Sequence, residues 1–539
     1  MINSRLTSRL GVLFGLLVAG GFLMPIGFST VFSATSDGSV KRTVFLGAGQ
    51  NGMPDFGNIT RFGVDLENIG DFNGDGVTDL AVGIQSSYTF DDLANSTFNE
   101  FFFILLMNQD GTVSETIKVE ESHEEGEMFH ALQMYGHGIA SLGDFDGDGV
   151  IDFAVGAPDY DTGPFGSAQD DKGALFITLM NANGTVKSVT EIKDDLNGIP
   201  TLSDRDRFGT AVTNIGDIDG DGNTDIAVSA VSDSDPDEGS IEASTGKIYI
   251  LLLNGDGSIK SSVEISNASN NLGLSTEDLL GTSMDRLGDY DGDGVPDLLV
   301  GAGGDNDSRG AFLILYLNDD GTLKSFRKYT ASDLPGAPVG GALGQGLAQI
   351  GDLDENGTAD FAVSLGIVDG ETVSGIYLVL LMNPDGSVKS TTSVPDGTNG
   401  FAELPAFNFL GLALTGMGDL DGDGVLDLAV SDSFFFNGTT TQGSAYIVFN
   451  AEADTGGGGE GSETATPSPT ASPTPSPTPV PTVEILSGAV SETVKIADST
   501  GGMTTLADSD SFGSSVTNIG DLNGDGVEDM VVGASGDDT

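Results

Sequence analysis

The hydrophobic and polar positions of this chain follow a pattern of short strands that repeats roughly every 60–75 residues. In the first complete repeat, Gly63 to Ile69 is a weakly patterned strand and Asp79 to Ile84 is a short apolar run. Phe101 to Met107 is a longer apolar run, and Val113 to Val119 alternates as an edge strand does. After the first 34 residues no sustained helical periodicity occurs. The pattern predicts an all-β fold made of four-stranded antiparallel units.

The last two strands of most units are joined by turns of one type. The turn is Asn108-Gln-Asp-Gly111 in the first unit, and equivalent turns end at Gly184, Gly257, Gly321 and Gly386. The final glycine supplies the positive φ that a tight hairpin needs. Four antiparallel strands at this spacing predict the blade of a β-propeller with long loops.

An acidic loop lies between the first and second strands of each unit. In Asp144-Phe-Asp-Gly-Asp-Gly-Val-Ile-Asp152, oxygen-bearing side chains on alternate residues can converge on one point. Gly149 can take the left-handed conformation that turns the chain sharply. Carboxylates this close repel one another unless a cation lies between them. Because hard oxygen ligands at this density suit Ca²⁺, the loop predicts a calcium site.

The loop recurs in fixed register, which chance does not explain. A pair consisting of an aromatic residue or leucine and then glycine lies nine residues before each loop, from Phe62-Gly63 to Phe512-Gly513. The predicted ligands occupy positions one, three, five and nine, together with position seven, which contributes its backbone carbonyl. In loops one to seven these residues are Asp71, Asn73, Asp75, Val77, Asp79; Asp144, Asp146, Asp148, Val150, Asp152; Asp217, Asp219, Asp221, Asn223, Asp225; Asp289, Asp291, Asp293, Val295, Asp297; Asp352, Asp354, Asn356, Thr358, Asp360; Asp419, Asp421, Asp423, Val425, Asp427; and Asp521, Asn523, Asp525, Val527, Asp529.

The spacing excludes an EF-hand. That motif needs a bidentate Glu at position twelve and a helix on each side. Here Val82 and Val155 occupy position twelve, inside apolar runs that predict strands. Loop five departs from the others at Glu355, Asn356 and Thr358, so we expect it to have the most weakly held ion.

The loops, the Phe-Gly pairs and Gly156-Ala-Pro158 together resemble the FG-GAP repeat, the unit of the β-propeller at the head of integrin α subunits. The resemblance covers roughly residues 40–450 and 485–539, although Gly-Ala-Pro itself occurs only once in these flanking positions. In that family the loops bind Ca²⁺. The resemblance therefore implies a calcium-binding propeller.

The ends of the repeat array predict the number of blades. The sixth unit stops after Ala445 to Phe449 without a fourth strand, whereas Ser36 to Phe45 is patterned as a fourth strand without partners. We expect the N-terminal strand to complete the last blade and to close a ring of six. Integrin propellers have seven blades, and seven is the alternative.

The N-terminal segment, residues 1–34, is predicted to be a signal peptide. Arg5 and Arg9 precede the apolar run Leu10 to Met24, and cleavage after Ser33 suits the small residues there. An uncleaved membrane anchor is the alternative. Either interpretation predicts export.

Three further segments follow. Residues 35–454 are the predicted FG-GAP propeller, and residues 455–483 are a linker rich first in Gly and then in Pro, Ser and Thr. Residues 484–539 contain an incomplete second repeat region. We expect it to be the start of a second propeller in a truncated sequence; the alternative is a half-blade that pairs with another chain.

The composition limits the partners. The 82 acidic and 20 basic residues give a net charge of −62, which argues against nucleic acid or an anionic membrane as a partner. Because the chain has no Cys, disulfides cannot hold the fold together and thiol catalysis is excluded. We therefore expect bound metal ions to stabilise the fold in place of disulfides.

Candidate contact residues fall in the loops on the face opposite the acidic loops. They are Tyr88, Asp159, Tyr160, Phe165 and the run Phe434-Phe-Phe436, which are interpreted either as a contact patch or as packing beneath a loop. His123, His130 and His137 are the only histidines, and nearby Glu residues raise a transition-metal hypothesis. Nothing in the other repeats resembles that histidine group.

Three classes of function remain. The first is a secreted or cell-surface calcium-binding FG-GAP propeller that recognises an extracellular protein or glycan, with structural Ca²⁺ and no catalytic residues. The alternative is an extracellular hydrolase or lyase with its site on the face opposite the calcium loops. A purely architectural surface protein is a third possibility.

Overall fold

The computed structural model describes residues 36–55, 59–86, 101–120, 134–160, 171–194, 199, 201–231, 245–275, 278–304, 309–338, 340–369, 372–394, 408–435, 442–451, 511–520 and 529–535. The chain divides into two compact units, Met1–Gly457 and Gly458–Thr539. The predicted signal peptide and linker lie outside the described residues.

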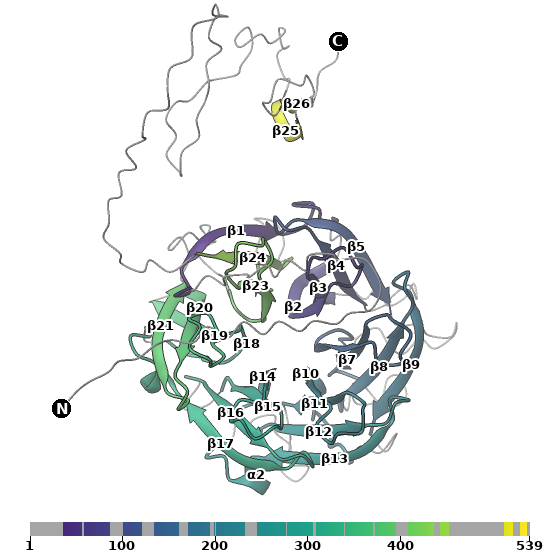
Figure 1. Cartoon of the computed structure of the whole chain (residues 1–539), viewed down its shortest axis with the longest axis vertical. Coiled ribbons are helices and arrows are strands. Elements are labelled where there is room, and N and C mark those ends of the chain that lie inside the picture. Colours follow the sequence, from purple (N-terminus) through teal and green to yellow (C-terminus); the bar gives the residue numbers. More distant parts are fainter. Residues whose placement is uncertain are drawn as a thin grey trace, which may run out of the picture. The chain divides into compact units, whose positions relative to one another are not determined.

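Six four-stranded antiparallel sheets form a ring in the first unit, as the repeating pattern of strands predicts (Figure 1). Blade one contains β2 (Ile59–Gly70), β3 (Asp79–Ser86), β4 (Phe101–Met107) and β5 (Val113–Glu120); blade two contains β6 (Ile139–Gly143), β7 (Asp152–Ala157), β8 (Ala174–Met180) and β9 (Val186–Lys193); blade three contains β10 (Phe208–Gly216), β11 (Asp225–Ala230), β12 (Lys247–Leu253) and β13 (Ile259–Ser266). Blade four contains β14 (Leu280–Gly288), β15 (Asp297–Ala302), β16 (Ala311–Leu317) and β17 (Leu323–Tyr329); blade five contains β18 (Leu347–Gln349), β19 (Phe361–Asp369), β20 (Thr372–Met382) and β21 (Val388–Val394); blade six contains β22 (Leu414–Gly418), β23 (Asp427–Asp432), β24 (Ser444–Asn450) and β1 (Val40–Leu46). Two short helical turns follow outer strands, namely α2 (Asn267–Asn270) and η2 (Ala331–Asp333).

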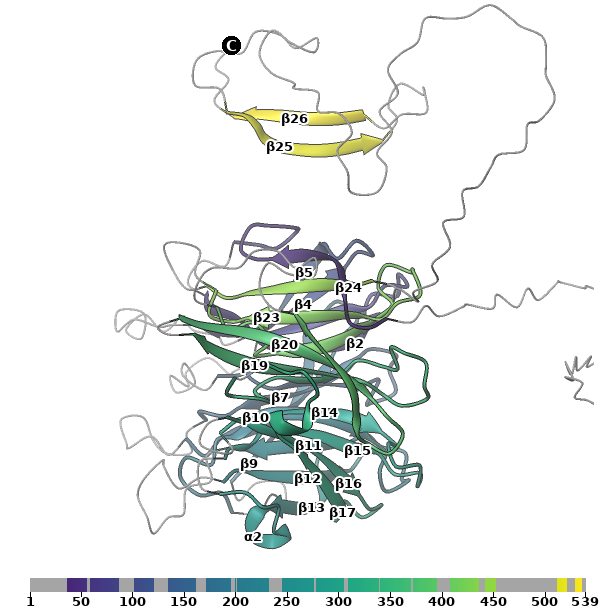
Figure 2. The ribbon, with the colours of Figure 1, turned by 90° about the vertical axis from the view of Figure 1, so that its left-hand side faces the viewer.

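The first strand of each blade lies nearest the centre of the ring and the fourth strand lies outermost (Figure 1). Seen from the side, the strands run from one face of the ring to the other (Figure 2). The acidic loops and the third hairpin turns therefore share one face. We call it the acidic-loop face, and the other the opposite face.

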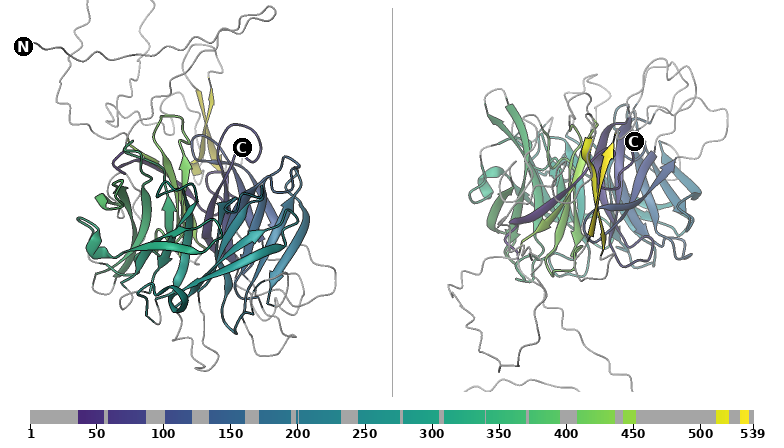
Figure 3. Two further views of the ribbon diagram at one scale, coloured as in Figure 1. Left: turned by 60° about the horizontal axis from the view of Figure 1, so that its bottom comes forward. Right: turned by 90° about the horizontal axis from the view of Figure 1, so that it is seen from above.

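The N-terminal strand closes the ring. β1 pairs antiparallel with β24, with Val44 opposite Ile447 and Leu46 opposite Ala445. This arrangement places the green strands of blade six beside the purple and blue strands of blade one (Figures 1 and 3). The predicted closure and the count of six blades are confirmed, and the alternative of seven is wrong.

Each blade packs on the next through its own hydrophobic cluster. Between blades one and two, Phe102, Ile104, Phe153 and Phe176 are almost fully buried together. Blades six and one are joined in the same way by a cluster that includes Phe449. Because both faces of each sheet are covered by neighbouring blades, the middle strands are apolar throughout rather than alternating.

The glycine of each Phe-Gly pair allows neighbouring blades to approach closely. Phe208 is fully buried, and Gly209 has φ +95°. A Cβ on Gly209 would lie 2.5 Å from the carbonyl oxygen of Ala174 and 3.0 Å from the Cα of Gly156, both in blade two. Only glycine satisfies both the positive φ and this contact. In the six blades of the ring, the pair that precedes each loop is therefore explained by packing between blades.

Polar side chains link the exposed edges of the innermost strands. Asp65 on β2 accepts a hydrogen bond from the N–H of Ile139 on β6 at 2.7 Å. Asp285 on β14 accepts one from the N–H of Gln349 on β18 at 2.6 Å. An inner strand is an edge strand with unpaired backbone groups, so these carboxylates satisfy donors that no neighbouring strand pairs.

The same carboxylates line the central channel of the ring. Asp65 and Asp285 line one cavity among the inner strands. A second cavity, of about 450 Å³, opens where the inner strands end, and Glu67 and Asp285 contribute to its wall. Burial raises the pKa of Asp65 to about 7 and that of Asp285 to about 6, and their mutual repulsion adds to the shift of Asp65. The channel thus holds acidic groups that are costly to ionise.

In the described part of the chain, no helix has the length and apolar character needed to cross a membrane. In the second unit the described residues form one hairpin of β25 (Ser511–Gly520) and β26 (Asp529–Ser535). A complete second propeller is not shown.

We predict that Asp65→Asn removes part of the pH dependence of stability. Asn keeps an oxygen that can accept the Ile139 N–H but cannot ionise. Wild-type Asp65 ionises near pH 4 when unfolded and at about pH 7 when folded, so its contribution is complete below pH 4 and is lost as the pH rises to 7. The melting temperature of the variant minus that of the wild type should be larger at pH 8 than at pH 5. An identical shift at both values would contradict the prediction.

Candidate metal centre

The acidic loops are held in shape by hydrogen bonds from their own backbone. In loop one, the carboxylate of Asp71 accepts the N–H groups of Gly74, Asp75 and Gly76 at 2.7, 2.9 and 2.7 Å. The predicted left-handed glycine is present, with Gly149 at φ +89° in loop two. The chain therefore curls around the side chain at position one, which turns alternate side chains toward the inside of the loop.

The aspartate at position nine is buried and joins three parts of its blade. In loop three, Asp225 accepts the N–H of Ile218 at position two of the loop at 3.0 Å and that of Leu253 at the end of the third strand at 2.8 Å. All six blades repeat both bonds, through Asp79, Asp152, Asp225, Asp297, Asp360 and Asp427. This residue begins the second strand in five blades and directly precedes it in blade five, and its hydrogen bonds hold the acidic loop to the blade.

Burial of the position-nine carboxylates makes their charge costly. It raises the pKa of Asp225 to about 6 and those of Asp360 and Asp427 to about 7, against the opposing effect of the backbone hydrogen bonds. A cation held next to these groups would favour the ionised form.

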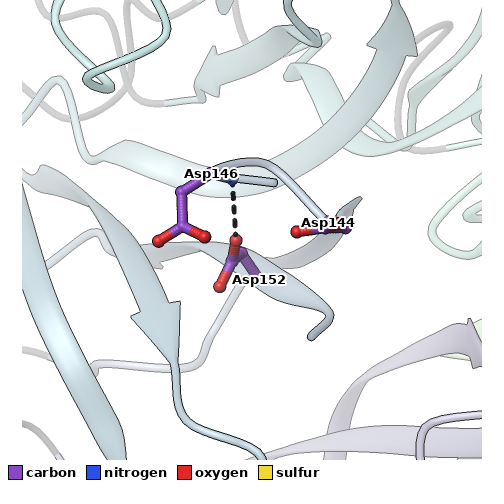
Figure 4. A group of neighbouring side chains, drawn as sticks. All are labelled: Asp144, Asp146 and Asp152. Atoms are coloured by element: carbon purple, nitrogen blue, oxygen red, sulfur yellow. Dashed lines mark hydrogen bonds between the residues drawn. The ribbon is translucent and has the colours of Figure 1, made fainter. Parts of the chain in front are cut away.

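Three carboxylates converge in each of five loops. Figure 4 shows this for Asp144, Asp146 and Asp152 in loop two, whose side chains come from one turn of the chain and the start of β7. One oxygen from each lies within 4.8 Å of the others. The same holds for positions one, three and nine of loops three to six: Asp217, Asp219, Asp225; Asp289, Asp291, Asp297; Asp352, Asp354, Asp360; and Asp419, Asp421, Asp427.

The donor set fits a hard divalent cation. All converging atoms are carboxylate oxygens, the ligands that Ca²⁺ takes. In loop six, Oδ1 of Asp421 is buried and accepts no hydrogen bond from the described residues. A buried carboxylate oxygen without a donor is costly, and a cation would satisfy it.

Two of the predicted loops differ from these five. Among the described residues, loop one has no such set of three, because Asn73 occupies position three. In loop seven, Asp521, Asn523, Asp525 and Val527 lie outside the described residues, and Asp529 begins β26.

Sequence reasoning missed a lysine that contacts the acidic loop in five blades. Lys187 on β9 lies 2.6 Å from Oδ2 of Asp146 and 2.5 Å from Oδ2 of Asp148. The equivalent residues are Lys260, Lys324, Lys389 and Lys41. The signal was present in the sequence, because each lysine is the third residue after a turn glycine, as in Gly184-Thr-Val-Lys187.

Segments of the chain are similar to curated integrin α chains. It is 32% identical to "Integrin alpha-4" of Xenopus laevis over 160 residues, which are 30% of this chain and 13% of that protein. It is 34% identical to "Integrin alpha-3" of Cricetulus griseus over 168 residues, 31% of this chain and 14% of that protein. For "Integrin alpha-V" of Gallus gallus the identity is 29% over 238 residues, 44% of this chain and 19% of that protein.

The ring is an integrin-like propeller. Each match spans less than a fifth of the length of the relative. The chain matches no known protein-family profile.

Other candidate residues of the integrin-like propeller have ordinary partners where the structure describes them. Tyr160 is buried, and its hydroxyl lies 2.9 Å from Nζ of Lys193, while Asp159 forms an ion pair with Arg207 at 2.7 Å. Nδ1 of His137 lies 3.0 Å from the carbonyl oxygen of Thr210, and burial lowers the pKa of this histidine. Tyr88, His123, His130 and Phe165 lie outside the described residues, so the histidine-site hypothesis is untested.

We predict that positions three and nine of one loop differ sharply in the absence of metal. Asp225→Ala should lower the free energy of unfolding by about 2–5 kcal/mol, because two buried N–H groups lose their acceptor. Asp219→Ala, at a less buried position of the same loop, should cost about 1 kcal/mol or less. Urea denaturation in EDTA measures both. Equal losses would show that the buried hydrogen bonds of Asp225 do not dominate.

Proposed function

We propose that this chain is an exported, calcium-binding, integrin-like propeller that recognises an extracellular protein or glycan without catalysing a reaction. The observation that carries the proposal is the convergence of three aspartates in each of five loops. The similarity to integrin α chains supports it. A secreted or cell-surface location follows from the predicted signal peptide.

The loop residues would hold calcium as a structural ion. In loop two, the side chains of Asp144, Asp146, Asp148 and Asp152 and the carbonyl of Val150 are the proposed ligands, and loops one and three to seven would use their equivalent residues. Bound Ca²⁺ would neutralise the repulsion among these carboxylates. The chain itself supplies the frame, because Asp152 also holds the backbone N–H groups of Phe145 and Met180 at 3.0 and 2.7 Å.

The proposed recognition surface lies on the opposite face. β23 starts at Asp427 in loop six and ends at Asp432, so the residues that follow lie at the other end of the blade. There the rings of Phe434 and Phe409 are 4.8 Å apart, and the guanidinium of Arg61 lies 4.0 Å from the centre of the Phe434 ring. Phe409 is 37% exposed.

This aromatic pair and its arginine suit recognition. Aromatic residues and Arg supply much of the binding energy at protein interfaces, because they bury a large area and Arg adds a charged group that donates hydrogen bonds. The next residue, Phe435, packs on Phe45 with ring centres 5.1 Å apart, so it serves the interior of the blade instead. The Phe434–Phe436 run is thus divided between surface and packing in its described part.

We predict that the full chain binds several Ca²⁺ ions and melts at a lower temperature in EDTA. Sites of extracellular-module affinity have dissociation constants of about 10⁻⁴–10⁻³ M. Calcium at ten times that value would contribute about 1.4 kcal/mol per site. Calorimetric titration counts the sites, and thermal melts measure the stabilisation.

A loop variant and a matched control locate the ions. D144A/D146A should remove one site from the calorimetric count, whereas Asp319→Ala, at an exposed hairpin turn, should leave it unchanged. Mg²⁺ should bind more weakly, because it demands a smaller and more regular set of ligands. The absence of any calcium binding or melting shift would overturn the structural-calcium part of the proposal.

We predict that R61A/F434A weakens binding of the calcium-loaded chain to its extracellular partner by tenfold or more. The immobilised full chain would be screened against extracellular-matrix proteins and a glycan array. Phe326→Ala is the control, since Phe326 is an exposed phenylalanine, at 36%, on the outer strand β17, away from the Phe409 and Phe434 pair. A partner that binds R61A/F434A as tightly as the wild type would place recognition elsewhere.

A further inference from the structure

We propose that the outer-strand lysine of blades two to six is a built-in counter-charge that lowers the Ca²⁺ affinity of its loop toward a common value. We call these residues, Lys187, Lys260, Lys324, Lys389 and Lys41, the compensating lysines. The inference rests on the proposed calcium function of the loops. It assigns a role to residues outside the predicted ligand set.

The compensating lysines have one geometry. Each is the second residue of the outermost strand of its blade, as Lys260 is in β13. In blades two, three, four and six its ammonium contacts Oδ2 of the aspartates at positions three and five; for Lys260 these are Asp219 at 2.7 Å and Asp221 at 2.5 Å. The aspartate at position three is thus one of the three converging carboxylates and also contacts the lysine ammonium.

The lysine is present wherever position three is an aspartate. Loops two, three, four and six each have four aspartates among their predicted ligands, so lysine reduces a formal charge of −4 to −3. Loop one has Asn73 at position three and carries −3 from Asp71, Asp75 and Asp79. Ser114 of β5 stands where the others have lysine. In five of the six loops, the predicted ligands and the lysine, where present, thus have the same net charge of −3.

Loop five keeps the lysine and loses an aspartate elsewhere. Its position five is Asn356, and Lys389 contacts Asp354 at 2.5 Å. Its ligands and lysine together carry −2, although Glu355 lies beside them in the loop. This is the loop for which we expect the weakest affinity.

Loop one has no lysine, and it shows that the hydrogen bond made by the lysine can be supplied without its charge. Nδ2 of Asn73 donates to Oδ2 of Asp75 at 2.9 Å, the position-five oxygen that the lysine contacts in blades two, three, four and six. A donor to this oxygen is therefore supplied with or without lysine. What the lysine adds is a positive charge, and in blades two, three, four and six it is added where a fourth negative charge is present.

The physical effect follows from this balance. Without metal, the ammonium reduces repulsion among the carboxylates; with metal, it repels the bound Ca²⁺. The lysines are partly exposed, with side-chain exposures of 36–47%, so water and salt moderate both effects. In blade six the charge comes from Lys41 on β1, the strand that closes the ring.

Loop four allows the test at a single site. Tyr290 is its position-two residue, and the chain has no Trp, so Tb³⁺ luminescence of the full chain is sensitised by tyrosine and includes a signal from this loop. Because Tyr290 also lies near Asp360 of loop five, the loop-four part of the signal is the part that is lost both in Tyr290→Phe and in Asp289→Ala. Displacement of Tb³⁺ by Ca²⁺ then gives the Ca²⁺ dissociation constant of that loop.

Three variants form a cycle that copies loop one into loop four. Lys324→Ser should tighten Ca²⁺ binding on the order of tenfold, and Asp291→Asn should weaken it by a similar factor. D291N/K324S has the charge and residue types of loop one and should return to within about threefold of the wild type. Lys328→Ser is the matched control, because Lys328 is on the same strand and contacts the Gly273 carbonyl oxygen.

The outcomes distinguish this inference from the proposed function. If wild-type loop four binds Ca²⁺ and Lys324→Ser binds no tighter, or tighter only as much as Lys328→Ser does, the counter-charge role is overturned and calcium binding stands. Weaker binding by Lys324→Ser would also overturn it, in favour of a purely orienting role. A wild-type chain that binds neither Tb³⁺ nor Ca²⁺ would overturn both proposals.

Discussion

The buried aspartate at position nine is the interaction on which each blade depends. Its carboxylate accepts backbone N–H groups from the loop before it and from the end of the third strand, in all six blades. An acceptor with several lone pairs can satisfy both donors and still face a cation. An apolar residue there would leave two buried donors unpaired, which costs more than the burial of a carboxylate that is fully hydrogen-bonded. The residue thus has a structural role in the blade that does not require a bound metal ion.

A ring adds a second constraint, because every blade must fit the one before and the one after. Hydrophobic clusters supply the adhesion between blades, and the glycine of the Phe-Gly pair permits the close approach that these clusters require. At the centre, the inner strands remain edges. Asp65 and Asp285 bridge them with hydrogen bonds, at the cost of placing acids where ionisation is unfavourable. Closure by β1 then removes the free ends of the array.

The two faces of the integrin-like propeller are built on different principles. The acidic-loop face repeats the same loop in every blade. Only the charges vary: blade one has Asn73 and Ser114 where blade two has Asp146 and Lys187. Among the described residues of the opposite face, the Phe409, Phe434 and Arg61 group occurs in one place. Repetition suits stability, since each blade needs the same hydrogen bonds to hold its acidic loop. Recognition needs a surface that differs from place to place on a rigid support.

The sequence by itself determined what is local and repeated: the strands, the turn glycines and the acidic loops. The unpaired segment at 36–45 indicated six blades closed by the N-terminus, and the structure decided between six and seven. These features depend on residues a few positions apart, so patterning reveals them. Only the tertiary structure decided the contacts between distant residues. Lys187 meets Asp146 across 41 residues, and Asp65 meets Ile139 across 74. Arg61 and Phe434 come together because closure of the ring makes the first and last blades neighbours. Such pairings follow from how the blades pack in space, and a one-dimensional pattern does not contain that geometry.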